Sequence, residues 1–212
     1  MATNYNSRIV TNGLVMYLDA ANIKSYPGTG TTWTDVSANG KNGTLVNTPT
    51  YSATNSGSLV FNGTTNYITS TITFTSGQAL TIIGWLYSTE TTATSRNFFD
   101  SVVQNPMIWW NTSGSIEFDA AQYTTSTVYR NQWVQVALSK PTGSSSASYY
   151  VNGVLVGTGT AYTVPTATPT WFNRAGAQSW LGSCSTVQVY NRALSAAEIT
   201  QNFNALRGRY GI

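Results

Sequence analysis

Short apolar runs, separated by glycine, proline, asparagine and serine, recur along the chain about every 8–12 residues, which is typical of a β-sandwich or barrel. The runs are rich in β-branched and aromatic residues, which favour strands. Asn-Gly dipeptides supply the positive φ angles of tight turns and occur at residues 12–13, 39–40, 42–43, 62–63 and 152–153. Strands are therefore expected at Leu14–Leu18, Ser58–Phe61, Tyr67–Thr73, Leu80–Tyr87, Met107–Trp110, Ser115–Phe118, Trp133–Ser139, Ser148–Val151, Val154–Thr158 and Thr186–Tyr190.

The clearest local signal is a hairpin between Tyr149 and Val156. Two β-type runs flank Asn152-Gly153 there, and a two-residue Asn-Gly loop is the strongest short-range hairpin signal. The run Trp133–Leu138 precedes this hairpin across a Gly/Ser-rich segment. The sequence thus predicts three antiparallel strands in succession, and no stretch suggests parallel βαβ units.

One helix is expected near the C-terminus. Ser195 and Glu198 have the spacing of a capping box, in which each side chain satisfies a free backbone N–H of the other residue. Apolar residues follow at helical spacing, namely Ile199, Phe203 and Leu206. Arg207 and Arg209 then lie where cations favour a helix C-terminus.

The composition replaces ionic groups with neutral polar ones. The 212 residues include 10 Lys and Arg and 7 Asp and Glu, so charged residues make up 8%, against roughly a quarter in an average domain. The chain has 34 Thr, 23 Ser and 19 Asn, which predict a surface wetted by dipoles. Its 7 Trp, 13 Tyr and 7 Phe provide ample core material. No linker-like segment divides the chain, so residues 1–212 are expected to form a single domain.

Several kinds of function are excluded by what the chain lacks. Without His, it cannot form a Ser-His-Asp triad, a Cys-His pair or a His-built zinc site. Its one cysteine, Cys184, permits no internal disulfide and is expected to be a small buried thiol. A net charge of +3 spread over scattered cations does not indicate nucleic-acid binding, which needs Lys and Arg clustered on one face. The longest apolar runs are too short to span a membrane, and Met1–Arg8 shows no secretory signal.

Three blocks of sequence carry a resemblance to a known family. The first runs from Gly13 to Asn22 and on through Trp33–Leu45, the second is Ser58–Ile68, and the third is Val187–Ile199 with its Gly-Arg-Tyr-Gly-Ile tail. Together they resemble the laminin-G-like, concanavalin A-like modules that tailed bacteriophages carry in virion proteins. The resemblance implies an all-β fold, a two-sheet antiparallel jelly-roll sandwich with a short C-terminal helix. It also implies glycan or protein binding more than catalysis.

The chain departs from this family at positions that often hold calcium. Related modules carry acidic residues in a Phe-Asp-Gly-x-x-Asp-Tyr segment and before the penultimate strand. Here Asn62, Asn66 and the neutral triplet Cys184–Thr186 take those places, and amides and hydroxyls bind a hard dication poorly without carboxylates. We therefore expect neither a structural metal nor a cofactor. Carboxylates that remain for a weak calcium site are Asp19, Asp35 and Asp100.

A catalytic role would depend on Glu117 and Asp119, the only close acidic pair. Strand alternation would point both carboxylates to one face. Sandwich glucanases that resemble this family carry a Glu-x-Asp-x-(x)-Glu strand, with one carboxylate as nucleophile and another as acid/base. Ala120–Gln122 follow here, so the second Glu is absent. We therefore expect that the protein is not an enzyme and that Glu117 and Asp119 lie on an ordinary solvated face of a strand. A glycoside hydrolase is the alternative.

A binding surface is expected around Trp109-Trp110. Adjacent strand residues face opposite sides, so one indole enters the core and the other can stack on a sugar ring. The alternative is that the outer indole lies under a loop or against another subunit. Trp171 admits the same two interpretations. The candidate glycan-binding or contact surface comprises Trp109, Trp110, Asn111, Glu117, Asp119, Gln122 and Trp171. The tryptophans expected in the core are Trp33, Trp85 and Trp133.

These observations lead to a functional expectation. The chain is expected to be a non-enzymatic phage virion protein, a capsid decoration or fibre-associated subunit, with other capsid or tail proteins as partners. The absent signal and the run from an initiator Met to a compact tail agree with cytoplasmic assembly into a virion. A glycan-binding module for host attachment is the alternative. No nucleic-acid or membrane partner is expected, and self-association into a homo-oligomer is compatible with the composition but not encoded by any pattern.

Overall fold

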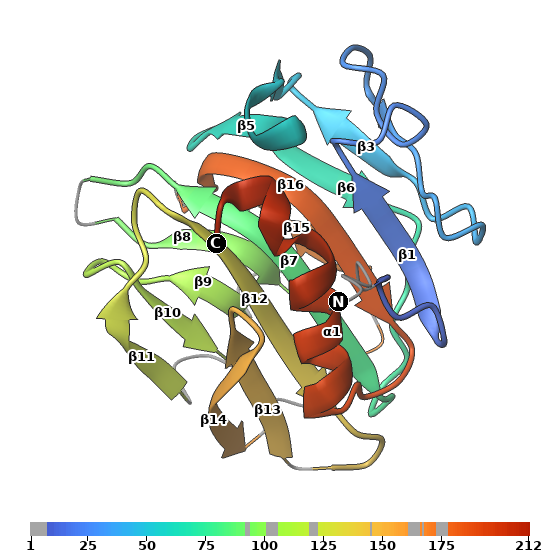
Figure 1. Ribbon diagram of the computed structural model, residues 1–212, viewed down its shortest axis with the longest axis vertical. Coiled ribbons are helices and arrows are strands. Elements are labelled where there is room, and N and C mark those ends of the chain that lie inside the picture. The colour runs from blue at the N-terminus through green and yellow to red at the C-terminus, as the bar shows by residue number, and fades with distance from the viewer. Residues whose placement is uncertain are drawn as a thin grey trace, which may run out of the picture.

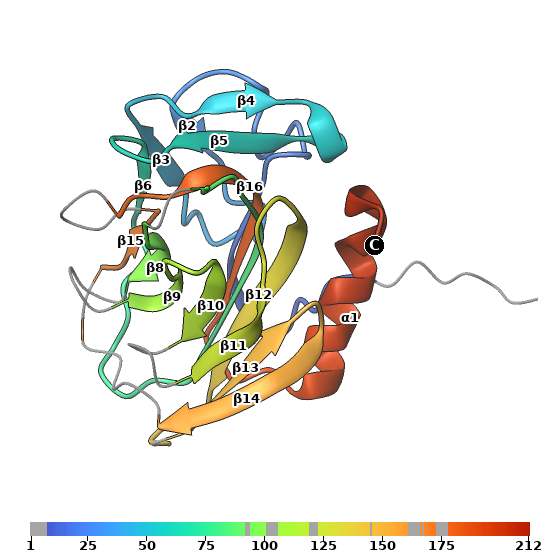
Figure 2. The same ribbon diagram turned by 90° about the vertical axis from the view of Figure 1, so that its left-hand side faces the viewer.

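The computed structural model describes residues 8–91, 94–100, 106–118, 123–144, 146–160, 166, 168–172 and 178–212. Two antiparallel sheets pack face to face, and one helix lies on the outer face of one of them (Figures 1 and 2). The expected all-β sandwich with a short C-terminal helix is confirmed. No helix among these residues is long and apolar enough to cross a membrane.

The sheet that carries the helix is called the helix-side sheet. Its described strands are β1 (Leu14–Asp19), β4 (Thr50–Ser52), β5 (Ser58–Asn62), β7 (Leu80–Ser88), β12 (Trp133–Lys140), β13 (Ser146–Val151), β14 (Val154–Thr160) and β16 (Leu181–Tyr190). They are ordered β14-β13-β12-β7-β16-β5-β4, and β1 pairs with β16. The short 3₁₀ helix η1 (Thr54–Ser56) connects β4 to β5.

The opposite sheet is called the far sheet. Its described strands are β2 (Thr32–Trp33), β3 (Gly43–Val46), β6 (Tyr67–Ser70), β8 (Arg96–Asp100), β9 (Pro106–Trp110), β10 (Ser115–Phe118), β11 (Tyr123–Val128) and β15 (Thr170–Trp171). They are ordered β11-β10-β9-β8-β15-β6-β3-β2. The helix α1 (Ala196–Leu206) and the 3₁₀ turn η2 (Arg207–Tyr210) end the chain.

Each of the ten strands expected from sequence overlaps an observed one. Successive pairing of β12, β13 and β14 is confirmed. Asn152 and Gly153 have φ angles of 51° and 75°, as a tight hairpin turn requires. The strands that the sequence missed are β2, β3, β4, β8, β11 and β15, which are short, polar or interrupted by a bulge.

A cluster of buried hydrophobic side chains fills the space between the two sheets and extends from Met16 to Val189 along the chain. Cys184 belongs to it, fully buried as expected, and burial raises the pKa of its thiol. The sheets approach closely at Gly84 of β7, where a Cβ atom would lie 2.5 Å from Cζ of Phe98 in β8. Only glycine fits there without displacing that ring.

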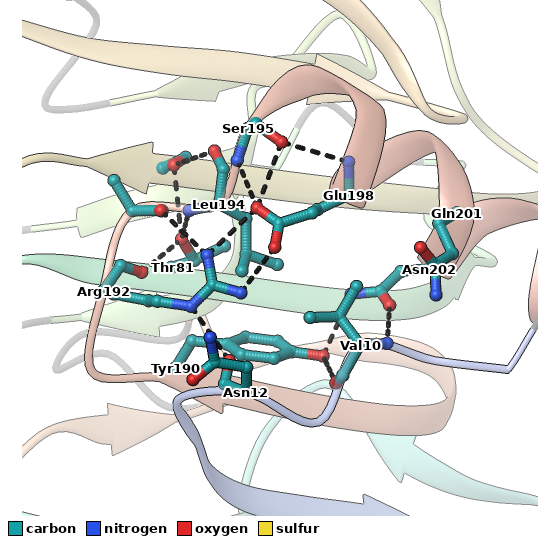
Figure 3. A network of polar contacts seen from close by, with 12 residues as sticks. Val10, Asn12, Thr81, Tyr190, Arg192, Leu194, Ser195, Glu198, Gln201 and Asn202 are labelled. Atoms are coloured by element: carbon teal, nitrogen blue, oxygen red, sulfur yellow. Dashed lines mark hydrogen bonds and ion pairs between the residues drawn. The ribbon is translucent and has the colours of Figure 1, made fainter.

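The start of α1 is held by the capping box that the sequence predicted (Figure 3). The Ser195 hydroxyl accepts a hydrogen bond from the Glu198 backbone N–H, and Glu198 Oε2 accepts one from the Ser195 N–H at 2.9 Å. The Arg192 guanidinium donates to both carboxylate oxygens of Glu198, at 2.6 and 3.0 Å. Arg192 also donates to the carbonyl of Asn12, so one carboxylate ties the helix to the end of β16 and to the N-terminal segment.

A second set of buried contacts fixes the N-terminal segment beneath the helix (Figure 3). Val10 donates its backbone N–H to Asn202 Oδ1 at 2.7 Å, and its carbonyl accepts from the Tyr190 hydroxyl at 2.9 Å. Asn202 in turn donates to that same hydroxyl at 3.0 Å. These bonds join α1, β16 and the N-terminal segment, and thereby hold the helix against its sheet.

Replacing Glu198 by Gln should destabilise the protein at neutral pH but not in strong acid. Hydrogen bonds from Arg192, and then from the Ser195 backbone, lower the pKa of Glu198 to about 2, against about 4.3 in an unfolded chain. A carboxylate whose pKa is depressed by folding stabilises above the unfolded pKa, and this stabilisation is lost as pH falls toward 2. We expect Glu198→Gln to lower the free energy of unfolding by about 1 kcal/mol at pH 7. Urea unfolding at pH 7 and pH 2.5 measures both values.

Ser195→Ala is the matched control, because it removes the uncharged half of the capping box. Its cost should vary less with pH than that of Glu198→Gln. A cost of Glu198→Gln that stays constant from pH 7 to 2.5 would contradict this account.

Candidate functional site

Two indoles of the expected binding surface belong to the core. Trp110 and Trp171 are each 1% exposed. The Trp110 N–H donates to the carbonyl of Tyr129 at 2.8 Å, and the Trp171 ring packs against Phe99 with centroids 4.6 Å apart. Both side chains are needed to fill the space between the sheets, so neither is an open platform for a sugar ring.

Three of the expected residues do come together on the far sheet. Trp109 of β9 lies directly opposite Glu117 of β10, and the Asn111 amide donates to Glu117 Oε1 at 2.7 Å. Trp109 is only 7% exposed. The expectation of an exposed indole in the Trp109-Trp110 pair is therefore wrong, because both indoles are buried.

The remaining expected residues, Asp119 and Gln122, lie outside the described residues. The carboxylate of Glu117 is half-buried and bound to Asn111.

Two of the carboxylates considered for a weak calcium site, Asp35 and Asp19, instead bind groups of the protein itself. Asp35 accepts backbone N–H groups of Tyr17, Ser37 and Lys41 at 2.8–2.9 Å, and Asp19 pairs with Arg209 at 2.8 Å. Across the described ranges, no three His, Cys, Asp or Glu side chains are grouped to hold a metal ion.

A pocket that sequence reasoning missed opens on the outer face of the helix-side sheet. It has a volume of about 280 Å³ and is lined by Ser52, Thr54, Asn55, Ser58, Tyr87, Trp133 and Ser183. We call it the Tyr87–Trp133 pocket. Its base is one row across the sheet, because Tyr87 of β7 pairs with Trp133 of β12 on one side and with Ser183 of β16 on the other. The two aromatic rings lie 5.7 Å apart and are inclined at 56°, so they form a corner.

The C-terminal segment determines where the pocket begins. Two residues before Tyr87, Trp85 is fully buried under Phe203 of α1 and Tyr210 of η2, with ring centroids 5.6 and 4.1 Å away. The ring of Tyr210 also packs against that of Trp133, with centroids 4.8 Å apart. The cover reaches no further along the sheet, and Tyr87 and Trp133 remain half-buried. The pocket is thus the end of the sheet face that the helix leaves open.

The orientation of the Trp133 indole is fixed by Asn55. The indole N–H donates to Asn55 Oδ1 at 3.0 Å, and the amide of Asn55 reaches the carbonyl of Arg209 at 3.4 Å. Asn55 has a φ of 54°, in the left-handed region that asparagine tolerates. One side chain therefore joins η1, β12 and the C-terminal turn at the edge of the pocket.

Several hydroxyls of the pocket have no hydrogen bond to another described residue. They belong to Ser58, Tyr87 and Ser183, of which Ser58 is only 2% exposed. A hydroxyl in a pocket wall that has no protein partner is free to form hydrogen bonds with water or a ligand. Aromatic faces beside free hydroxyls suit a ligand that has both apolar ring faces and many hydroxyls.

The expectation that Trp133 lies in the core is corrected by this geometry, whereas Trp33 and Trp85 are fully buried as expected. A signal was present in the sequence. In β12 the apolar Val134 and Val136 alternate with Trp133 and Gln135, which places Trp133 on the face opposite to the core. The neighbouring Tyr87 could not be found in this way, because nearly every residue of β7 is apolar.

An antiparallel two-sheet sandwich with one short covering helix defines the jelly-roll class of fold. The model of the concanavalin A-like lectin/glucanases superfamily matches residues 61–200, more than half of the chain. The chain belongs to this superfamily, which confirms the laminin-G-like, concanavalin A-like part of the resemblance found in the sequence. No curated protein matches it.

Solved structures at low sequence identity share the fold. A mutant sialidase from Trypanosoma rangeli has a TM-score of 0.69 and 16% identity over 96% of this chain and 34% of its own. The binding domain of Paraclostridial Mosquitocidal Protein 1 has a TM-score of 0.70 and 14% sequence identity, and the match covers 92% of this chain and 52% of that domain's chain. A third structure is Domain 4 of AbnA, a GH43 extracellular arabinanase from Geobacillus stearothermophilus, solved with arabinotriose. Its TM-score is 0.65 and its sequence identity 19%, and the match covers 89% of this chain and 97% of that domain. The chain spans about a third of the sialidase and about half of the mosquitocidal domain.

Removing the Asn55 side chain should free the Trp133 indole. In Asn55→Ala the indole N–H of Trp133 loses its acceptor, so it should exchange faster with solvent and the protein should lose about 1 kcal/mol of stability. The indole resonances in a ¹H–¹⁵N spectrum, with Trp133 assigned through Trp133→Phe, report the exchange. Asn55→Asp keeps an acceptor oxygen and is the control. Equal exchange in all three proteins would show that Asn55 does not position the indole.

Proposed function

We propose that the protein is a non-catalytic carbohydrate-binding module that holds part of a glycan in the Tyr87–Trp133 pocket. The observation that carries this proposal is the pocket itself, in which two half-buried aromatic rings stand beside hydroxyls that have no hydrogen-bond partner among the described residues. Sugar rings stack their apolar faces on aromatic side chains, and their hydroxyls both donate and accept hydrogen bonds, as do those of Ser and Tyr.

The comparisons support this proposal through the fold. The arabinanase domain was solved with arabinotriose and is matched over nearly its whole length, so a sandwich of this size is compatible with saccharide binding. The base of the pocket is built on β7, β12 and β16, strands of a single sheet. A site on such strands needs little rearrangement to bind, which favours affinity.

The absence of catalysis is part of the proposal. Retaining and inverting glycosidases need two carboxyl groups about 5–9.5 Å apart across the scissile bond. None of the seven described residues that line the pocket is a carboxylate, and Glu117 lies on the far sheet. Release of reducing sugar from a polysaccharide by the wild-type protein, lost in Glu117→Gln, would contradict this part of the proposal.

Substitutions in the pocket should weaken glycan binding while the fold persists. On a glycan array, and then by calorimetry with the best ligand, we expect Trp133→Ala to reduce affinity at least about tenfold, equivalent to about 1.4 kcal/mol. Ser58→Ala should cost roughly two- to tenfold, from about 0.5–1.5 kcal/mol per hydrogen bond. Glu117→Gln and the exposed Ile23→Ala are controls that should bind normally.

Thermal unfolding of each variant separates lost binding from lost structure. Binding that survives Trp133→Ala and Ser58→Ala but disappears in Glu117→Gln would move the site to the far sheet. Failure of the wild-type protein to bind any glycan would contradict the proposed function.

A place on a bacteriophage particle is the second candidate, as a capsid decoration or fibre subunit that could use the same pocket on host glycans. It is supported by the sequence blocks described above and by the ion-poor composition, with 8% charged residues. A neutral surface docks through hydrogen bonds that depend little on salt.

Immunogold electron microscopy of purified particles tests this location. Many copies on the head would indicate decoration, and label at the fibre would indicate attachment. A protein that is absent from intact particles would contradict the second candidate.

A further inference from the structure

The Tyr87–Trp133 pocket has a chemical character that restricts its ligand. Its seven described lining residues are four Ser or Thr, one Asn, one Tyr and one Trp, so no Lys, Arg, Asp or Glu is among them. Starting from the proposed function, that this pocket binds a glycan, we propose that it selects uncharged saccharides and discriminates against sugars that carry a carboxylate.

Arg209, a cation linked to the pocket by a hydrogen bond of its backbone, is already neutralised. Asn55 joins the pocket to Arg209 through the backbone carbonyl of that residue. The guanidinium of Arg209 donates to both oxygens of Asp19, at 2.8 and 2.9 Å. Asp19 is 2% exposed, so removing Arg209 from it would leave a buried charge without a partner, which is strongly unfavourable. Arg209 is thus committed to the fold and not available to a ligand.

A carboxylated sugar would enter this site at a net cost. Its charge would lose hydration, and hydroxyls compensate a desolvated carboxylate less well than a guanidinium does. An uncharged sugar meets no such penalty, because each pocket hydroxyl offers one donor and two acceptor positions. Ser58 is the least exposed of the residues that line the pocket, at 2%, and its hydroxyl has no partner among the described residues.

The size of the pocket limits how much of a glycan it holds. Its volume of about 280 Å³ lies just below the range of small-molecule sites, roughly 300–1,000 Å³. This suits one or two sugar rings. The inclined rings of Tyr87 and Trp133 would contact two sides of one sugar, with the hydroxyls of Ser58 and Ser183 beside them.

The test compares matched neutral and acidic saccharides on the wild-type protein. The probes are galactobiose with digalacturonate, cellobiose with cellobiuronate, and lactose with 3′-sialyllactose, together with arabinotriose, all in 50 and in 500 mM NaCl. We expect binding of neutral members, at least tenfold weaker binding of their acidic counterparts, and less than a twofold change with salt. Acidic members that bind as tightly as the neutral ones, with loss in Ser58→Ala, would overturn the selectivity while the proposed function stands.

A pair of variants tests the same selectivity through a gain of binding, so the result does not depend on a loss of affinity. Thr54 is an exposed residue of the pocket, so Thr54→Lys places a cation beside the ligand without touching the core. It should raise affinity for digalacturonate or sialyllactose at least threefold and make it salt-dependent, whereas Thr54→Gln should not. No gain in Thr54→Lys would overturn the electrostatic explanation. No binding of any probe by any protein would overturn both the selectivity and the proposed function.

Discussion

The structure depends on the burial of the two faces of the helix-side sheet, which is partial on the outer face. Its inner face packs against the far sheet around a shared hydrophobic cluster. Its outer face carries aromatic residues as well, and Trp85 requires the cover that Phe203 and Tyr210 give it. One helix of 11 residues and one short 3₁₀ turn cannot cover the whole of that face. The uncovered end, with Tyr87 and Trp133, becomes the pocket, so the candidate site is a direct consequence of incomplete burial.

Hydrogen bonds between neutral groups do much of the work that ion pairs do in other domains. Asn202 and Tyr190 hold the N-terminal segment, and Asn55 holds the Trp133 indole. Two of the few carboxylates stabilise the C-terminal segment: Glu198 pairs with Arg192 at the start of the helix, and Asp19 pairs with Arg209 in the last turn. None of the described residues that line the pocket is charged, and this supports the proposed recognition by shape and hydrogen bonding.

Much of the fold could be read from local pattern. The Asn152-Gly153 hairpin, the capping box of Ser195 and Glu198, and the central strands all follow from signals that lie within a few residues of one another. The missed strands lacked such signals. β8 carries bulges that break its alternation, and β11 is mostly Thr and Ser, whose polarity resembles that of a loop. Their pairing comes from neighbouring strands that supply the hydrogen bonds.

The site was harder to predict, and the error is instructive. Trp109-Trp110 looked like a platform because adjacent strand residues face opposite ways, but both faces of that strand are buried. Trp133 looked like core because it begins a regular strand, yet its face is left open. The sequence alone determined the antiparallel all-β class, the hairpin, the helix cap and the shortage of charge, because these depend on neighbours in the chain. Only the tertiary structure decided which aromatic rings reach the surface, because that depends on where the last helix ends across strands β7, β12 and β16.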